Sequence, residues 1–305
     1  MGTPEFAVPA LQTLVENGYN VVGVITATDK MGGRGGKKLI ESDVKKYAVA
    51  QGLNILQPKN LKNPEFVEEV RELKADLQIV VAFRMLPEVI WNMPEHGTYN
   101  LHGSLLPRFR GAAPIHWAVM KGAEETGVTS FKLKHEIDTG DLLFQEKTRI
   151  TKEDTTGDVY ERLMHMGAEV VLKTVKAVES GNVTLMAQDN SQVSKAPKIY
   201  HETCEIDFTK TAIEVYNHIR GLNPFPTAWT TIDGLECKIL KSGMSDEELD
   251  SSHMPGTILT DNKRYLKIAC SDGYLAILDL KMQGKKKMDI KSLLNGYTVQ
   301  GKKVG

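Results

Sequence analysis

The sequence predicts an α/β fold in which a doubly wound, Rossmann-like parallel sheet is followed by a small OB-like β-barrel. In the first half, short apolar runs alternate with stretches that carry apolar residues at helical spacing, which is typical of a parallel sheet with helices on both faces. After residue 226, five short strand-like runs separated by turn residues indicate a small barrel. A chain of 305 residues is long enough for two domains. We expect domains at residues 1–182 and 200–305, joined by a linker at 183–199.

Hydrophobic periodicity assigns the elements in order. Strands of the first domain are expected in Val/Ile-rich or apolar runs, at 19–26, 54–57, 77–83, 98–102, 127–133 and 142–150. Helices are expected at 9–17, 42–51, 63–74, 85–92, 112–121 and 155–181. Ser42 is a suitable N-cap for the second of them, and Asn63-Pro64 is expected to open the third. The second domain is expected to contain a helix at 210–220 and strands at 228–232, 237–241, 256–259, 266–269 and 274–281.

Composition limits the class of protein. Hydrophobic residues make up 41% of the chain and charged residues 25%, and the net charge is −1. Any nucleic-acid contact must therefore rest on local basic patches, such as the lysine-rich stretch after residue 280. The three cysteines lie far apart without metal-ligand spacing, which indicates reduced thiols. With no signal peptide, apolar span or repeat in view, we expect a cytoplasmic protein that binds no membrane and no metal.

An amide and an imidazole share one strand of the predicted sheet. In the short buried strand 98–102, Asn100 and His102 point the same way because alternate side chains share a face. A helix at 112–121 follows closely, and ligands of open α/β sheets bind at such strand ends. The other interpretation is a core Asn and His with satisfied hydrogen bonds. Two polar side chains on a buried face are costly unless each finds a partner, so we favour a working site.

A carboxylate lies in the connection that follows. Asp138 stands between the strand-like runs 127–133 and 142–150, on a loop of the kind where catalytic groups are common. The Asp-Thr-Gly sequence also occurs in aspartic proteases, but these need two copies and this chain has one. Taken alone, Asp138 is an ordinary turn carboxylate. Beside Asn100 and His102 it supplies the carboxylate that polarises an imidazole in acyl transfer.

Residues 29–38 form a glycine-rich, basic stretch. It is not a P-loop, because Lys38 stands where Ser or Thr is required. Its composition suits contact with a polyanion, and it suits a solvated surface loop equally well.

Several motifs together resemble the folate-dependent formyltransferases. They are Asn-Leu-His-Gly-Ser-Leu-Leu-Pro-Arg at 100–108, Arg-Gly-Ala-Ala-Pro at 110–114 and Ile-Asp-Thr-Gly-Asp at 137–141. The segments Gly2–Ala7 and Gly221–Pro226 resemble the members of this family that act on methionyl-tRNA. The resemblance covers nearly the whole chain. The Asn/His/Asp set is common to several formyltransferases, whereas the Gly-Arg-Gly loop and the C-terminal half are more specific.

The resemblance implies transfer of a formyl group from the co-substrate 10-formyltetrahydrofolate to the α-amine of methionyl-initiator tRNA, by a monomer. It implies that Asn100, His102 and Asp138 are catalytic. It implies that backbone groups of one turn contact the folate, namely those of Ser104, Leu105, Leu106 and Pro107. It implies that the glycine-rich stretch contacts tRNA through Arg34, Lys37 and Lys38, and that the barrel contacts the tRNA backbone.

Other readings stay open. A formyltransferase acting on a sugar nucleotide or another small amine would share much of the chain. A folate-dependent hydrolase, or a non-catalytic RNA-binding protein on the same scaffold, belongs to a different class. Residues 1–4 resemble the turn after the family's first apolar strand. Either the printed sequence starts late or this sheet lacks that strand.

Overall fold

The computed structural model describes residues 1–32, 35–36 and 38–304. The chain forms two compact units. Unit 1 consists of Met1–Pro114, Thr126–Thr148 and Tyr160–Lys195, and unit 2 of Ile115–Glu125, Arg149–Val159 and Ala196–Gly305. The domain limits expected from the sequence remain a prediction.

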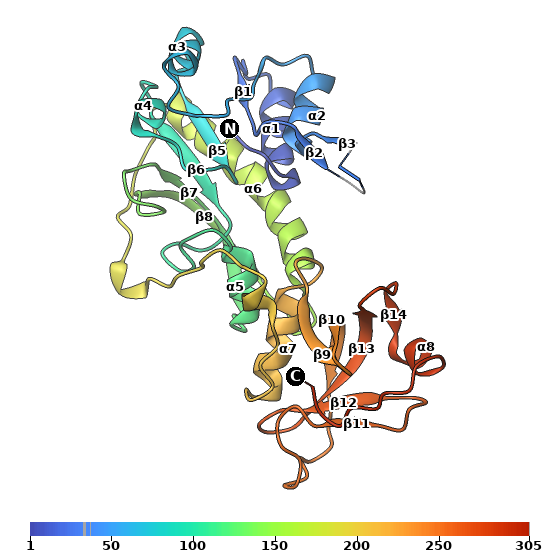
Figure 1. The fold of residues 1–305 in the computed structure, drawn as a ribbon. Helices are drawn as coiled ribbons and strands as arrows, with labels where there is room; N and C mark the ends of the chain where they lie inside the picture. Colours follow the sequence, from blue (N-terminus) through green and yellow to red (C-terminus); the bar gives the residue numbers. More distant parts are fainter. Residues whose placement is uncertain (33–34, 37, 305) are drawn as a thin grey trace. The chain divides into compact units, whose positions relative to one another are not determined.

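Unit 1 is organised around the sheet order β5-β6-β7-β8 (Figure 1). These strands are β5 (Gln78–Val81), β6 (Thr98–His102), β7 (Glu125–Lys132) and β8 (Leu142–Arg149). A separate pair joins β1 (Val24–Ile25) and β4 (Ile55–Leu56). The pairs β1-β4 and β5-β6 are parallel, as predicted, whereas β6 and β7 are antiparallel. The sheet is therefore mixed, and the long run predicted at 19–26 contributes only the two residues of β1.

Helices cover both faces of this sheet, as predicted. In unit 1 they are α1 (Val8–Glu16), α2 (Asp43–Ala50), α3 (Pro64–Glu72), α4 (Glu88–Trp91) and most of α6 (Thr156–Glu179), whereas α5 (Pro114–Met120) lies almost wholly in unit 2. Val80 of β5 packs in one cluster with residues of α3 and α4. Its neighbour Ile79 packs in another cluster with Val178 of α6. Because adjacent side chains of a strand point to opposite faces, α6 and the pair α3/α4 lie on opposite sides.

Local signals explain several helix boundaries. The Ser42 hydroxyl accepts the Lys45 N–H, so the predicted N-cap is confirmed. The Asn63 side chain accepts the Glu65 N–H and caps the helix that Asn63-Pro64 was expected to open. In contrast, α5 starts at Pro114, two residues later than predicted. A residue that precedes proline is disfavoured in helical backbone, which explains the later start.

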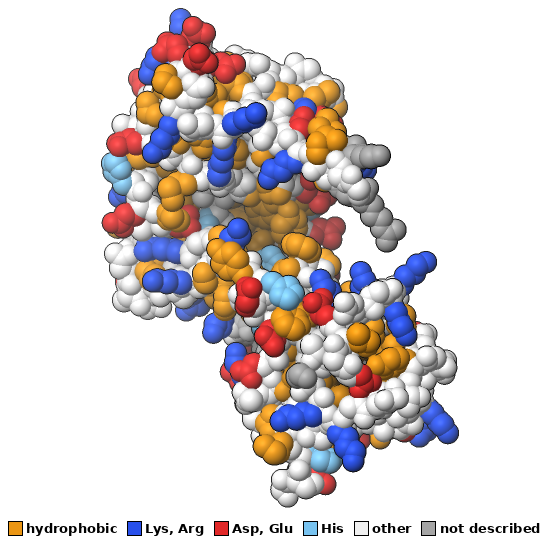
Figure 2. Space-filling view, viewed as in Figure 1, with side chains coloured by type: hydrophobic (Ala, Val, Ile, Leu, Met, Phe, Trp, Pro, Cys, Tyr) orange, Lys and Arg blue, Asp and Glu red, His pale blue; other side chains and the backbone are white. Residues whose placement is uncertain are grey.

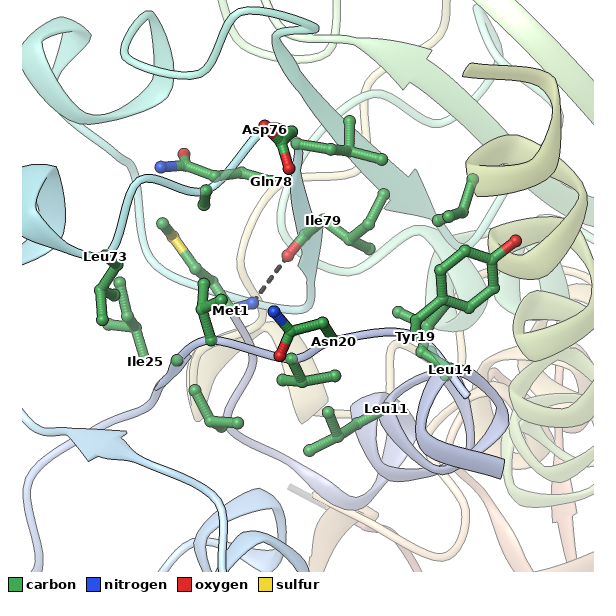
Figure 3. Close-up of a pocket in the computed structure, with 18 of the residues that line it drawn as sticks. Met1, Leu11, Leu14, Tyr19, Asn20, Ile25, Leu73, Asp76, Gln78 and Ile79 are labelled. Carbon is green, nitrogen blue, oxygen red and sulfur yellow. Dashed lines mark hydrogen bonds between the residues drawn. The ribbon is translucent and has the colours of Figure 1, made fainter. Parts of the chain in front are cut away.

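Met1 and Gly2 lie between β1 and β5. The Met1 amino group donates to the Ile79 carbonyl (2.6 Å), and the Gly2 N–H donates to the Ile25 carbonyl (3.1 Å). Burial lowers the pKa of the Met1 amino group to about 5. A cavity of about 660 Å³ adjoins these residues, with apolar side chains of α1 on one wall (Figure 3). The described lining residues include none of the predicted site residues.

The glycine-rich stretch contains structure that periodicity did not predict. Strands β2 (Lys30–Gly32) and β3 (Lys38–Ile40) pair antiparallel, with Gly32 opposite Lys38. Neither strand buries a side chain, because every residue in them is exposed or half-buried. Without a buried face there is no alternation of apolar and polar residues for the sequence to reveal.

Unit 2 contains a curled antiparallel sheet with the order β11-β12-β13-β10-β9, and β14 pairs with β13. Its elements are α7 (Ala212–Gly221), β9 (Ala228–Ile232), β10 (Leu235–Met244), β11 (Ile258–Thr260), β12 (Leu266–Ala269), β13 (Tyr274–Met282), β14 (Met288–Asp289) and α8 (Ile290–Leu294). The expected barrel-like fold is confirmed, and the helix and all five predicted strands are present. The short elements β14 and α8 were missed because they lie in the lysine-rich stretch.

The core of unit 2 encloses the three cysteines, all of them free thiols. Burial raises the pKa of Cys237 and of Cys270 to about 12. A thiol is a nucleophile only as the thiolate, so these two side chains act as apolar core residues. Among the described residues, no helix has the length and apolar character to cross a membrane.

A half-buried imidazole in α7 is expected to make the stability of unit 2 depend on pH. Burial lowers the pKa of His218 from its ordinary value of 6.5, and Nε2 has no hydrogen-bond partner among the described atoms. Below about pH 6.5 the unfolded chain binds a proton that the folded chain excludes, so the free energy of unfolding falls as the pH falls. We expect His218→Phe to flatten this fall. Urea denaturation of both proteins between about pH 7 and pH 5 measures it, and identical slopes would contradict the assignment.

Candidate active site

Strand β6 presents Asn100 and His102 on the sheet face opposite α6. Leu101 between them points to α6, where it contacts Gly167 so closely that a Cβ there would lie 2.6 Å from the Leu101 Cδ2. Alternation then directs Asn100 and His102 to the other face, as predicted. Two residues of a strand span ~6–7 Å, so both side chains reach one small region. His102 is buried and Asn100 half-buried.

The His102 ring has one partner on each side. Nε2 lies 2.9 Å from the Phe109 carbonyl oxygen, and Nδ1 lies 3.7 Å from Asp138 Oδ2. Because a carbonyl oxygen only accepts, Nε2 carries the hydrogen. In the tautomer with a single ring hydrogen, Nδ1 is unprotonated and faces the carboxylate. The Nε2 hydrogen is engaged by the Phe109 carbonyl, and the pair Nδ1/Oδ2 is suited to accept a proton.

Asp138 is held in an unusual backbone conformation. Its φ is +56°, in the left-handed region that aspartate tolerates better than most residues. Its Oδ2 accepts the Gly111 N–H at 2.8 Å, and the side chain is largely buried. Strained backbone of this kind persists where surrounding contacts determine it, and it gathers at functional sites. The structure thus brings Asp138 close to His102, 36 positions earlier in the sequence.

The turn that follows β6 is held from inside the protein. The Thr129 hydroxyl donates to the Ser104 carbonyl (2.6 Å) and accepts the Leu106 N–H (3.1 Å). The Gln145 amide donates to the Leu106 carbonyl (2.8 Å) and to the Thr129 hydroxyl (2.9 Å). Several backbone groups expected to contact folate are thus already paired, and the folate contacts of this turn stay a prediction. We missed Thr129, although a threonine inside an apolar strand needs a partner.

Of the three residues predicted to contact tRNA, the structure describes one. Arg34 and Lys37 fall outside the described residues, whereas Lys38 is exposed at the start of β3. Figure 2 shows lysine and arginine side chains scattered over the visible face of unit 2 rather than gathered in one patch. The described residues contain no group of three or more His, Cys, Asp or Glu side chains placed to hold a metal ion.

Comparison with known proteins places this geometry in a family. Residues 1–175 match a family model described as formyl transferase, and residues 198–298 match one described as formyl transferase, C-terminal domain. The chain belongs to the formyl transferase family. Curated proteins named methionyl-tRNA formyltransferase are 50% identical in Bacteroides fragilis and 47% identical in Porphyromonas gingivalis. These alignments cover 97% and 98% of this chain, and 94% and 95% of the relatives.

Solved structures support the fold. A sugar 3N-formyl transferase, crystallised with dTDP and 5-N-formyl-THF, has a TM-score of 0.68 at 21% identity and covers 93% of this chain and 97% of its own. An N-formyltransferase from Helicobacter canadensis, in complex with folinic acid and dTDP-3-aminofucose, has a TM-score of 0.70 at 22% identity. It covers 94% of this chain and 97% of its own. At these identities the likeness shows the fold alone.

Proposed function

We propose that this chain transfers the formyl group of 10-formyltetrahydrofolate to the α-amino group of methionyl-initiator tRNA, in the cytoplasm. The observation that carries the proposal is the site itself, with His102 Nδ1 3.7 Å from Asp138 Oδ2. The chain that carries this site is 50% identical, over 97% of its length, to relatives named methionyl-tRNA formyltransferase.

The reaction is direct attack by the neutral amine on the formyl carbon. A carbon–nitrogen bond forms to the amine, and the bond from the formyl carbon to the folate nitrogen breaks. The amine loses a proton and the folate nitrogen gains one. His102 and Asp138 present adjacent proton-accepting atoms, Nδ1 and Oδ2, which suit the uptake and return of that proton.

Asn100 supplies the other half of the chemistry. The tetrahedral intermediate carries a negative oxygen, and the Asn100 side-chain amide can donate to it. One such donor contributes roughly 3 kcal/mol to stabilising the transition state. The scheme uses no nucleophile from the protein, and the Ser104 hydroxyl that follows β6 is buried and donates to the Arg108 carbonyl (2.6 Å). The folate is a co-substrate contacted by the turn Ser104–Pro107, and no metal takes part.

One assay tests the proposed function. Purified protein is incubated with 10-formyltetrahydrofolate labelled in the formyl group and with charged initiator tRNA, and label in the RNA is measured. We expect label in methionyl-initiator tRNA and none in uncharged tRNA. Label that enters a dTDP-amino sugar but not the RNA would replace this function with sugar formylation. Label that appears only as formate would indicate a hydrolase.

The predicted tRNA contact at Arg34 gives a separate prediction. Removing one charge-assisted contact of ~1.5–3 kcal/mol should raise KM for tRNA about tenfold or more in Arg34→Ala. Folate affinity should stay unchanged, because the change concerns the tRNA alone. Steady-state kinetics with varied tRNA and a folate binding titration measure the two effects. Lys62→Ala, at an exposed lysine of unit 1, is the matched control. Lost folate affinity in Arg34→Ala would contradict the assignment.

A further inference from the structure

The segment that follows α6 is attached to the loops of the candidate site. We expected residues 183–199 to be a linker, yet the chain up to Lys195 belongs to unit 1. Met186 exchanges two backbone hydrogen bonds with Leu142 at the start of β8 (2.8 and 2.9 Å). Farther on, the Arg110 N–H donates to the Ser194 carbonyl (2.9 Å). We call residues 186–195 the strap. Figure 1 shows this segment in yellow, passing beside β7 and β8.

Gln188 is the inward-facing residue in an exposed part of the strap. Its neighbours Ala187 and Asp189 are exposed, whereas Gln188 is half-buried. Its Nε2 donates to the carbonyls of Asp138 (2.8 Å) and Gly140 (2.7 Å). Its Oε1 accepts from Nε (3.0 Å) and Nη2 (2.6 Å) of Arg110. Carbonyls only accept and a guanidinium only donates, so the partners determine the orientation of the amide.

These contacts connect Gln188 to Asp138 by two routes. Gln188 binds the backbone of Asp138 and the side chain of Arg110. The residue after Arg110 is Gly111, whose N–H donates to Asp138 Oδ2 (2.8 Å). Gln188 thus binds the backbone carbonyl of Asp138 directly. It also binds Arg110, whose neighbour Gly111 binds the Asp138 carboxylate. Two loops far apart in sequence are thereby kept at one separation.

We propose that Gln188 is a positioning residue for formyl transfer, which acts by holding Asp138 in place beside His102. This inference rests on the proposed function. Asp138 is held at φ +56°, which few residues adopt freely, so it depends on outside contacts. Small displacements of a reacting group cost large factors in rate, and the relevant distance from Nδ1 to Oδ2 is only 3.7 Å. Gln188 itself has all four hydrogen-bonding positions occupied within the protein, so it has none left for a substrate.

Gln188→Glu separates the two halves of this contact. The new carboxylate still accepts from Arg110, but its other oxygen faces the carbonyls of Asp138 and Gly140, which repel it. We expect kcat to fall on the order of tenfold, with KM for both substrates within about twofold of the wild-type value. Gln192→Glu makes the same chemical change at an exposed position of the strap and should leave kinetics unchanged. A fall in kcat shared by both variants, or a change in KM alone, would overturn the proposal.

A double-mutant cycle identifies the route of the effect. If Gln188 acts through Asp138, then introducing Gln188→Glu into the Asp138→Asn variant should lower kcat less than about twofold further. Independent, multiplying effects of the two changes would mean that Gln188 acts elsewhere, and the proposal would fail.

A measurement without turnover keeps the inference distinct from the proposed function. In protein labelled with isotopic glycine, the exchange protection of the Gly111 amide reports its bond to Asp138. We expect protection to fall at least about tenfold in Gln188→Glu and to persist in Gln192→Glu. Unchanged protection in both variants would show that Gln188 does not hold Asp138. If the wild-type chain formylates no methionyl-tRNA, the proposed function fails, while this readout still decides what Gln188 does to the loop.

Discussion

His102→Ala should lower kcat about a hundredfold or more, while KM for folate and for tRNA stays near the wild-type value. The ring has two engaged sides, with Nε2 on the Phe109 carbonyl and Nδ1 facing Asp138. In the proposed mechanism, its removal deletes a proton acceptor and leaves Asp138 without the neighbour that shares the proton. Neither effect touches ground-state binding, because the ring lies against protein groups on both sides.

Steady-state kinetics with labelled formyl donor and charged initiator tRNA measure this effect. His165→Ala, at an exposed imidazole of α6, is the control for loss of a histidine as such. Near-native turnover in His102→Ala would show that the assigned role is wrong. A rise in KM with unchanged kcat would instead move His102 from the chemical step to substrate binding.

Asn100→Ala should also lower kcat about a hundredfold, for a different reason. The amide is the one donor that β6 directs to the same region as the imidazole, and the negative oxygen of the intermediate needs such a donor. The half-buried position of Asn100 gives the donated hydrogen bond a partly desolvated setting, where electrostatic interactions are stronger than in water.

The two variants are expected to differ in their response to pH. Asn100 does not titrate, so Asn100→Ala should lower the rate equally across the pH range and leave the shape of the pH–rate profile unchanged. His102→Ala should change that shape. Asn92→Ala, at an exposed position, serves as the control. An Asn100→Ala variant that retains wild-type kcat would remove the oxyanion role from Asn100.

Local sequence carried much of the fold. β6 has the predicted bounds, and the side chains of Ser42 and Asn63 cap the helices that they were expected to start. These features depend on neighbours a few residues away, which is the range over which periodicity and capping act. The sequence did not predict strands that lack a buried face, such as β2 and β3, or a short strand in a charged stretch, such as β14.

The sequence by itself determined that Asn100 and His102 point to one face, because side chains two residues apart in a β-strand lie on the same side of the sheet. It also carried the motifs that indicated the family. Only the tertiary structure decided that Nδ1 of His102 faces Asp138 while Nε2 is held by Phe109, and that Gln188 holds both site loops. The contacts of Gln188 join residues 50 and 78 positions apart. No local pattern encodes such pairs, because they exist only once the sheet has brought its loops together.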